Sequence, residues 1–433
     1  MEGTLAGASH ILVPMETNAV SLPEVVRGAL RYCQGCGHET LERILDLGHH
    51  PPCDSLLMPT QLDEPEVAYP LRFCRCTSCG LAQIDYAVDP EILFFREYPY
   101  RTAMTRLLRD HFGALTTDAT QRLGLGAQSL AVDLGSNDGT LLQGFQAHGV
   151  RVLGVEPTGI ADIAIANGVP TVNAFFSEEV ADRIVAEHGH ASVVTGTNMF
   201  AHVNNLYPML RAVSTLLGPD GVFVSESHYL LDLLEDVQYD TIYQEHLRFY
   251  ALRPLMAILE RAGFSVFDVE RSPTHGGSIR VWADRGQRSP SPRVAEMLEL
   301  ETRSGLDDGT AFLRFRENVI ESKRQLLEIL VEARRRGRIV GLGAPGRAST
   351  ILNFVGLGPD VVESTLELDG SLKIGQYTPG THVPIIEERV GLATQPETLL
   401  VLSWHIGEEI VPKLRERGFK GTFVIPLPEP RVL

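Results

Sequence analysis

The sequence predicts an α/β protein with three parts: a small zinc-binding N-terminal domain, a central Rossmann-like domain and a C-terminal Rossmann-like lobe. Two cysteine pairs with metal-ligand spacing lie early in the chain, Cys33 with Cys36 and Cys76 with Cys79. Two later stretches, 129–142 and 338–346, have the pattern of a buried strand, a glycine-rich turn and the start of a helix. The length of 433 residues suits two or three domains, at about 150 residues for each domain.

Domain boundaries follow changes of pattern along the chain. Residues 1–28 show no sustained hydrophobic periodicity and are interpreted as an N-terminal extension. The zinc-binding domain is predicted over 29–90 and the central domain over 91–285. A linker that contains proline and serine, at 285–292, separates the central domain from the C-terminal lobe, which is predicted over 286–433.

Composition restricts the possible partners. Lysine and arginine total 38 against 55 aspartates and glutamates, which gives a net charge of −17. Nucleic acids and anionic membranes bind clustered positive charge, so neither is expected as a partner. The N-terminus lacks the basic region of a signal peptide, and no apolar run is long enough to span a bilayer. We therefore expect a cytoplasmic protein that is a monomer or a weak oligomer.

The cysteine spacing predicts a metal site. All six cysteines lie between Cys33 and Cys79, and four of them form two CxxCG motifs. Four thiolates complete a closed tetrahedral zinc site, which leaves no open position for catalysis, so a structural Zn²⁺ is expected. The predicted ligands are Cys33, Cys36, Cys76 and Cys79.

Two cysteines, Cys53 and Cys74, lie outside the paired motifs. Cys74 is two residues before Cys76, so both side chains share one face of a strand and Cys74 could compete for the metal. Zinc domains of this kind also bind partners. A partner-binding zinc module is therefore an alternative to an enzyme, although the acidic charge disfavours nucleic acid.

A strand that ends at Asp133, and the glycine turn after it, predict a cofactor site. Gly135 and Gly139 let the backbone bend and approach a ligand at the carboxyl edge of a parallel sheet. Glu156 ends the next strand about 20 residues further on, the spacing of an acid that binds a ribose. Asn137 stands where a dinucleotide loop has glycine, and the carboxylates suit the charged methionine part of S-adenosylmethionine better than a pyrophosphate. An ordinary tight turn is the alternative.

Further polar residues follow the later strands of the central domain. Asn198 and His202 come after the strand at 192–195, and Glu226 comes after the strand at 221–225. Because ligands bind at the carboxyl ends of parallel strands, these residues are expected at the same edge as the glycine turn. We assign Asn198 to the cofactor site.

The stretch Tyr243-Gln-Glu245-His246 brings together three side chains capable of acid–base chemistry. Neighbouring residues point about 100° apart on a helix and to opposite sides of a strand. Glu245 and His246 therefore do not face one atom equally, and one acts while the other orients it. A structural histidine is the alternative interpretation.

Two stretches are candidates for contact with a substrate. Tyr98 and Tyr100 belong to an aromatic cluster at 90–102, for which core packing and substrate contact are equally supported. His275-Gly-Gly-Ser278 precedes a strand, and its glycines expose backbone donors.

The C-terminal lobe offers an alternative function. Gly341-Leu-Gly-Ala-Pro-Gly346 is a true G-x-G-x-x-G after a strand, and Asp369 lies near the spacing of a ribose-binding acid. This pattern favours an NAD-dependent oxidoreductase. Pro345 counts against it, because proline removes one N–H from the loop that would bind the pyrophosphate.

The order of these motifs resembles the zinc-containing, S-adenosylmethionine-dependent C-methyltransferases of deoxysugar biosynthesis, which methylate carbon on nucleotide-linked 4-keto sugars for antibiotics. The resemblance runs from about Cys33 to the C-terminus. It rests on the two CxxCG motifs and on Asp133-Leu-Gly-Ser-Asn-Asp-Gly139, Asn198-Met-Phe-Ala-His202, Asp240-Thr-Ile-Tyr-Gln-Glu-His246, His275-Gly-Gly-Ser278, Gly341-Leu-Gly-Ala-Pro-Gly346 and Tyr377-Thr-Pro-Gly-Thr-His382.

The resemblance, to C-3 methyltransferases of TDP-4-keto-deoxysugars, implies a TDP-linked sugar held between the central and C-terminal domains; C-3 and another carbon next to the ketone both remain open as the methylated position. It implies that His246 is the base, with Tyr243, Glu245 and His202 close by. The G-x-G-x-x-G loop then belongs to the sugar-nucleotide side instead of an NAD site. Substrate contacts are implied at Tyr98, Tyr100, His275, Ser278, Arg347, Lys373, Tyr377 and His382.

Overall fold

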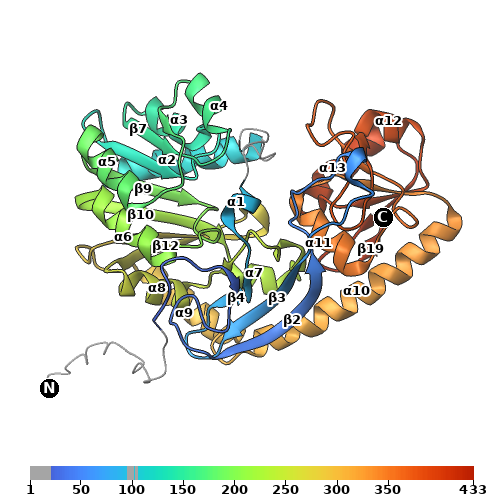
Figure 1. Cartoon of the computed structure of the whole chain (residues 1–433), viewed down its shortest axis with the longest axis horizontal. Helices are drawn as coiled ribbons and strands as arrows, with labels where there is room; N and C mark the ends of the chain where they lie inside the picture. The colour runs from blue at the N-terminus through green and yellow to red at the C-terminus, as the bar shows by residue number, and fades with distance from the viewer. Residues whose placement is uncertain (1–20, 95–101, 103–105) are drawn as a thin grey trace, which may run out of the picture.

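The protein is described here from a computed structural model, which describes residues 21–94, 102 and 106–433. Figure 1 shows two lobes side by side, the central domain in cyan to yellow and the C-terminal lobe in orange to red. A blue N-terminal sheet lies below the central domain and extends toward the C-terminal lobe. Tyr98 and Tyr100 lie outside the described residues.

The central domain is built on a seven-stranded sheet with the order β12-β13-β10-β9-β6-β7-β8. Strands β6 to β10 run parallel, and β13 runs antiparallel to both of its neighbours. The bounds are β6 (Leu130–Leu134), β7 (Arg151–Val155), β8 (Thr171–Val172), β9 (Ala191–Thr197), β10 (Leu217–His228), β12 (Ser265–Ser272) and β13 (Ser278–Asp284).

Helices cover both faces of this sheet, which explains why β6 is buried along its whole length. Side chains alternate between the two faces: Ala131 packs in one core cluster, while Leu130 and Val132 pack in the other. Helices α2 and α3 lie over the first face, and α5 and α6 lie over the second. The bounds are α1 (Pro90–Leu93), α2 (Arg106–Leu123), α3 (Thr140–Ala147), α4 (Ala161–Ala166), α5 (Glu178–His188), α6 (Leu206–Leu216), α7 (Leu230–Glu235) and α8 (Leu252–Arg261).

The N-terminal sheet contains a strand from the central domain. Its order is β11-β4-β3-β2, and β11 (Arg248–Phe249) pairs with β4 through Gln83 and Ala82. The other bounds are β1 (Gly28–Ala29), β2 (Leu41–His50), β3 (Tyr69–Cys76), β4 (Ala82–Ile84), β5 (Tyr86–Ala87) and the short helix η1 (Pro59–Gln61). Because β11 follows His246 by two residues, the N-terminal sheet fixes the chain next to a predicted site residue.

The C-terminal lobe has a second sheet, with the order β16-β15-β14-β17-β18-β19. All its pairs are parallel except β18 with β19. The strands are β14 (Ile339–Leu342), β15 (Thr365–Glu367), β16 (Ile385–Glu387), β17 (Thr398–Val401), β18 (Thr422–Ile425) and β19 (Arg431–Val432). The mixed α/β fold with a Rossmann-like central domain, predicted from the sequence, is confirmed.

Helix α10 (Thr310–Arg336) connects the lobes and runs along the lower side of the molecule in Figure 1. Its buried residues, including Phe312, Phe315 and Val319, recur every three or four positions, so one face is apolar. The remaining helices are α9 (Pro292–Ser304), α11 (Gly346–Val355), α12 (Glu388–Ala393), α13 (Gly407–Glu416), η3 (Tyr239–Thr241), η4 (Thr274–Gly276) and η5 (Trp404–Ile406). None of the helices in the described part of the chain has the length and apolar character needed to cross a membrane.

Candidate active site and metal centre

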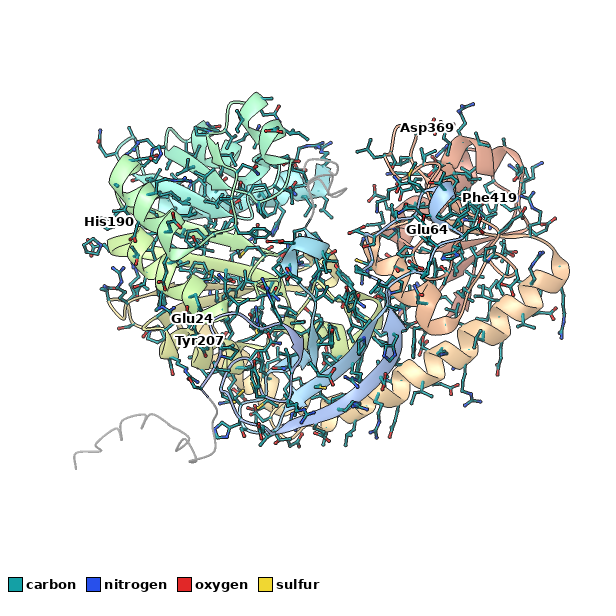
Figure 2. The ribbon with its side chains drawn as sticks, viewed as in Figure 1. Glu24, Glu64, His190, Tyr207, Asp369 and Phe419 are labelled. Carbon is teal, nitrogen blue, oxygen red and sulfur yellow. The ribbon has the colours of Figure 1, made fainter. Side chains whose placement is uncertain are left out.

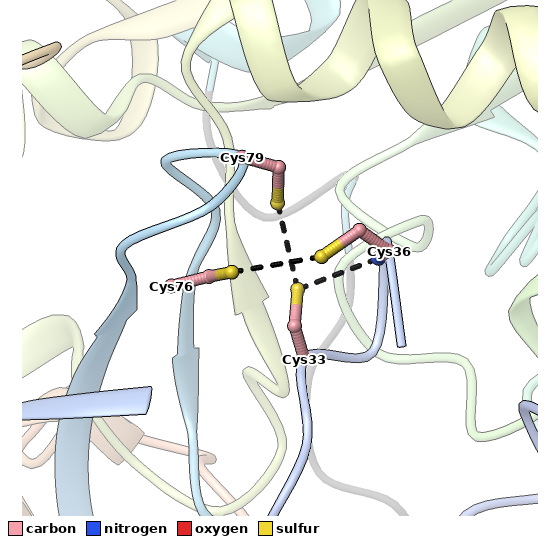
Figure 3. A group of neighbouring side chains, drawn as sticks. All are labelled: Cys33, Cys36, Cys76 and Cys79. Atoms are coloured by element: carbon pink, nitrogen blue, oxygen red, sulfur yellow. Dashed lines mark hydrogen bonds between the residues drawn. The ribbon is translucent and has the colours of Figure 1, made fainter. Parts of the chain in front are cut away.

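Four cysteine side chains point toward a common centre in the N-terminal domain (Figure 3). The Sγ atoms of Cys33 and Cys79 are 3.5 Å apart, those of Cys36 and Cys76 are 3.6 Å apart, and all four lie within 4.8 Å of one another. A tetrahedral zinc site with Zn–S bonds of about 2.3 Å needs sulfurs separated by about 3.8 Å. The four residues therefore fit a closed structural zinc site.

The two CxxCG motifs have the same backbone turn. Gly37 and Gly80 have φ of 82° and 78°, and each donates its N–H to the carbonyl of the first cysteine of its pair, at 2.9 Å. The left-handed conformation explains why glycine follows each second cysteine. In the first turn, the N–H groups of Gly35 and Cys36 point at Cys33 Sγ, at 3.4 and 3.5 Å, which stabilises a thiolate.

The two remaining cysteines lie outside this cluster. Cys74 Sγ lies 4.0 Å from the Arg72 carbonyl, and burial raises the Cys74 pKa to about 12. Cys53 is buried beside the side chain of Glu245, with 3.6 Å between Sγ and Oε1. Neither geometry brings the thiol to the four-cysteine centre.

A hydrogen-bonded network joins the first CxxCG motif to the central domain. Gln34, which lies inside the motif, accepts a hydrogen bond from Arg248 Nη1 at 2.6 Å. Arg248 is 1% exposed and also donates from Nε to Tyr250 Oη at 3.0 Å and from Nη2 to the Phe200 carbonyl at 3.3 Å. The Gln34 N–H donates to Gln83 Oε1 at 2.8 Å. The metal motif is thus rigidly connected to the strand that follows His246.

His246 lies in a buried cluster of rings. Its ring centroid is 4.1 Å from that of Tyr243, 4.8 Å from that of His202 and 5.1 Å from that of His228. The structure therefore brings together three of the predicted catalytic residues. His228 was given no role by the sequence, although it shares a strand face with Glu226, two residues earlier.

Hydrogen bonding assigns the tautomer of His246. Its Nδ1 lies 2.6 Å from the Thr241 carbonyl oxygen. Because a carbonyl can only accept, Nδ1 carries the proton and Nε2 has the free lone pair. Burial, assisted by the positive charge of Arg347, lowers the pKa of His246 to about 4. The imidazole is therefore neutral at pH 7 and able to accept a proton.

Glu245 and Tyr243 have different surroundings. Glu245 is 3% exposed and accepts a weak hydrogen bond from the Cys53 thiol, which agrees with the prediction that neighbours in this motif face different groups. Burial raises the pKa of Tyr243 well above its usual value, and Cys53 and Glu245 add to the shift. The Tyr243 hydroxyl therefore keeps its proton and remains a donor.

The predicted cofactor residues gather at the carboxyl ends of β6, β7 and β9. Glu156 accepts hydrogen bonds from the Asn137 N–H at 3.0 Å and from the Thr158 N–H at 2.9 Å. Asp133 accepts from Thr195 Oγ1 at 2.5 Å, and burial, assisted by the charge of Glu156, raises the Asp133 pKa to about 7. Glu156 thus supports the glycine turn and still has lone pairs for a ligand.

The two glycines of the turn have a packing role. Gly135 and Gly139 have φ of 67° and 81°, which side chains rarely adopt. A Cβ on Gly135 would lie 3.0 Å from Met199 Cβ, and one on Gly139 would lie 2.9 Å from Val169 Cγ2. These protein neighbours are sufficient to require glycine at both positions.

Asn198 provides a test of whether the site fits a polar cofactor. Its backbone has φ of 54°, and its N–H donates to the Glu226 carbonyl at 2.7 Å. The side-chain Oδ1 is buried and has no hydrogen-bond partner among the described residues. A buried acceptor of this kind is costly unless a ligand donates to it, so the edge fits a cofactor with N–H or O–H groups.

Arg347, a predicted substrate residue, lies at the contact between the two lobes. Its guanidinium forms two hydrogen bonds with Asp240, at 2.7 and 3.0 Å, and lies 5.1 Å above the Trp404 ring. Trp404 Nε1 also donates to Asp240 Oδ2 at 2.7 Å. Sequence reasoning gave no role to Asp240 or Trp404, although Asp240 lies in a stretch that the resemblance singled out.

The other predicted substrate residues have varied environments. Lys373 Nζ donates to the Ala344 carbonyl at 2.8 Å, and Ser278 Oγ donates to the Thr274 carbonyl at 3.0 Å. Tyr377 pairs through its backbone with Leu57. His382 Nε2 lies 3.1 Å from a Glu66 carboxylate oxygen, and the ring centroids of His275 and His228 are 5.8 Å apart. Tyr377 and His382 therefore fasten the N-terminal segment to the C-terminal lobe.

The second glycine loop is occupied by protein groups. A Cβ on Gly346 would lie 3.2 Å from both Asp54 Oδ2 and Cys53 Sγ. The Ala344 N–H already donates to Glu367 at 2.8 Å. Asp369, the predicted ribose acid, lies on the outside of the lobe (Figure 2), where it pairs with Arg389 at 3.6 Å. These carboxylates disfavour a pyrophosphate, and the NAD alternative loses its structural support.

Family models match three successive parts of the chain. Residues 33–94 match "Putative zinc binding domain", residues 103–269 match "Methyltransferase domain" and residues 273–428 match "C-methyltransferase C-terminal domain". The chain is 33% identical to C-methyltransferase NovU of Streptomyces niveus over 408 residues, which covers 93% of this chain and 96% of the relative. The chain belongs to this C-methyltransferase family. It is an S-adenosylmethionine-dependent C-methyltransferase with a zinc-binding domain.

Similar solved structures were also found for part of the chain. YcgJ from Bacillus subtilis has 13% identity and a TM-score of 0.33, and covers 40% of this chain and 97% of its own. The magnesium protoporphyrin IX methyltransferase ChlM from Synechocystis, solved with bound SAM, has 16% identity and a TM-score of 0.31, and covers 42% of this chain and 79% of its own.

We expect about one zinc ion per chain, held by the four clustered cysteines. Cys33→Ser should lose the metal and most of the methyltransferase activity, because Gln34 would no longer be held against Arg248. Cys74→Ser is the matched control and should keep both, since its thiol lies outside the cluster. Elemental analysis and circular dichroism measure the two effects. An active, folded and zinc-free enzyme would contradict the structural role.

We expect Glu156→Gln to weaken binding of S-adenosylmethionine by about 10- to 150-fold, which corresponds to about 1.5–3 kcal/mol for hydrogen bonds to a charged group. Glutamine keeps an acceptor for the turn, whereas alanine would leave the Asn137 and Thr158 N–H groups without one. Titration calorimetry measures the affinity, and the exposed Glu179→Gln is the control. Unchanged affinity in Glu156→Gln would exclude a ribose contact.

Proposed function

We propose that the enzyme methylates a carbon next to the ketone of a nucleotide-linked, TDP-bearing 4-keto-deoxysugar, and that His246 removes the proton from that carbon. The observation that carries the proposal is a buried neutral imidazole whose Nδ1–H is held by the Thr241 carbonyl, so that Nε2 is the basic atom. This imidazole lies near the contact between the central domain and the C-terminal lobe. The chain belongs to a C-methyltransferase family.

A carbon nucleophile explains the need for a base. A proton next to a ketone is too weakly acidic to leave unaided at neutral pH. In the proposed reaction, Nε2 of His246 takes this proton and the C–H electrons move to the ketone oxygen. The enolate carbon then attacks the methyl of S-adenosylmethionine, and the sulfur keeps the electrons of the broken S–C bond.

The surroundings of His246 suit an enolate. Tyr243 keeps its hydroxyl proton and can donate a hydrogen bond to the developing oxygen anion. Arg347 adds positive potential to the same region, since it lowers the pKa of His246. An enolate anion formed next to the imidazole would oppose the effect of Arg347 and raise the pKa of His246 as the imidazole takes up the substrate proton.

The nucleotide part of the proposal rests on the family likeness and on the cations at the lobe contact. Lys373 Nζ lies 3.7 Å from Asp54 Oδ1, and Arg347 is paired with Asp240, so one carboxylate compensates each cation. A diphosphate at this position would compete with Asp54 for Lys373. The ion pair between Arg347 and Asp240 is buried. We therefore expect Arg347 to orient the sugar and not to bind phosphate.

Solvent exchange tests the base separately from methyl transfer. With S-adenosylhomocysteine in place of the methyl donor, wild-type enzyme in heavy water should introduce deuterium at the carbon next to the ketone of a TDP-4-keto sugar. His246→Asn should lose both exchange and methylation, by about 100-fold or more, while cofactor binding persists. His190→Asn, an exposed histidine on the outer side of the central domain (Figure 2), is the matched control.

Two outcomes would contradict this assignment. Exchange at the wild-type rate in His246→Asn would place the base elsewhere, and loss of exchange in Glu245→Gln alongside that result would identify Glu245 as the base. Methylation of a substrate without a ketone, with no exchange at any position, would exclude the enolate mechanism.

The pH dependence of exchange gives a further prediction. Because the pKa of His246 is lowered to about 4, the neutral, reactive form persists from neutral pH down to about that value, well below the ordinary histidine value of about 6.5. The rate of exchange should therefore decline only as the pH falls toward 4. Circular dichroism at each pH separates this decline from acid unfolding. A decline centred near 6.5 would show that a different group controls the reaction.

A further inference from the structure

Two histidines to which the proposed reaction gives no role, His228 and His275, lie in a series of ring contacts that leads away from His246. The His228 ring centroid lies 5.1 Å from that of His246, and the His275 ring centroid lies 5.8 Å from that of His228. His246 is 3% exposed, whereas His228 and His275 are both partly accessible. The three imidazoles therefore form a series that begins at a buried ring and ends at more accessible ones.

Local structure holds this series in place. His228 is the last residue of β10 and pairs with Ser278 of β13, so the turn before β13 returns beside it. The Tyr229 N–H donates to the Gly277 carbonyl at 3.0 Å. A Cβ on Gly277 would lie 2.2 Å from an Asp232 carboxylate oxygen, which shows how tightly the turn packs.

His275 has a strained backbone within this turn. Its φ and ψ are 57° and 20°, in the left-handed region that residues other than glycine rarely adopt. Such a conformation is unfavourable and persists where the surrounding structure imposes it, often at functional sites. The turn contains two glycines that could take this conformation without cost, yet a histidine occupies the strained position.

The chemistry of the reaction requires a route for a proton. Each turnover converts a C–H bond and a sulfonium methyl into a C–C bond, a neutral thioether and one proton. His246 takes that proton and must lose it before the next turnover. Its Nδ1–H is held by Thr241, so the proton leaves from Nε2, the atom that received it.

We propose that His228 and His275 relay the proton from His246 to solvent. This inference rests on the proposed role of His246 as the base. Each imidazole accepts a proton on one ring nitrogen and releases one from the other, which inverts its tautomer, so rotation of the ring resets the relay after the final proton passes to water. The ring centroids are 5.1 and 5.8 Å apart, and the proposed relay uses a bridging water where two ring nitrogens do not meet directly.

Charges around the series favour movement in this direction. Burial lowers the pKa of His228 well below its usual value, and the charges of His246, His275, Arg347 and His202 add to the shift, so a proton does not remain there. His275 faces Arg347 and His111, which also lower its pKa, but it faces Glu226 as well, whose negative charge raises it. Glu226, which is buried and paired with Arg280 at 2.7 Å, thus favours a proton on His275 over one on His228.

Chemical rescue distinguishes a relay from a packing role. His228→Ala leaves space for free imidazole, whereas His228→Phe fills that space with a ring that carries no proton. Both variants should exchange the proton with solvent about 10-fold or more slowly than wild type. Added imidazole should restore exchange and turnover in His228→Ala in proportion to its concentration, and it should restore neither in His228→Phe. His275→Ala should behave like His228→Ala.

The measurement is the loss of label from a substrate deuterated next to its ketone, in ordinary water with S-adenosylhomocysteine bound. Wild-type exchange in His228→Ala, or slow exchange that imidazole does not restore, would overturn the relay. The His246→Asn variant separates this result from a failure of the proposed function: if His246→Asn still exchanges at the wild-type rate, the base is wrong. Slow exchange in His246→Asn together with normal exchange in His228→Ala rejects the relay alone.

Discussion

The buried guanidinium of Arg248 is the interaction on which the organisation of the site depends. It is 1% exposed and donates to Gln34 of the zinc motif, to Tyr250 and to the Phe200 carbonyl. A buried cation is costly unless its donors are satisfied, so these acceptors must be held in position together. The zinc motif holds one of them, and β11 carries Arg248 itself. The metal therefore contributes to the chemistry by fixing the chain two residues after His246.

A second buried charged residue, Asp240, connects the segment before His246 to the C-terminal lobe. Asp240 lies in the segment before His246, and it pairs with Arg347 at the start of α11 in the C-terminal lobe. Trp404 donates to the same carboxylate. Thr350 on α11 donates to the Ile242 carbonyl at 3.1 Å. One short segment of chain is thus held by the zinc-binding domain at one end and by the C-terminal lobe at the other, and the imidazole between them is 3% exposed.

Local patterns made much of the site predictable. The CxxCG spacing indicated the four cysteines that cluster, because the turn and the thiol spacing are set within each motif. The strand and turn around Asp133 indicated the cofactor edge for the same reason. Local pattern was ambiguous for the second glycine loop, where G-x-G-x-x-G fits an NAD-dependent oxidoreductase as well as the sugar-nucleotide side of a C-methyltransferase. Asp54, from a segment nearly 300 residues earlier, occupies the approach to Gly346.

The sequence by itself determined the residue types, the α/β fold and the metal-ligand set, because these depend on periodicity and short-range spacing. Tertiary structure decided which side chains share an environment. It put His228 and His275 beside His246, placed Cys53 against Glu245, and turned Tyr377 and His382 toward the N-terminal segment. No spacing rule relates residues on separate strands and lobes, since their proximity is set by sheet order and by packing between domains. Burial, and with it the lowered pKa of His246, exists only after that packing.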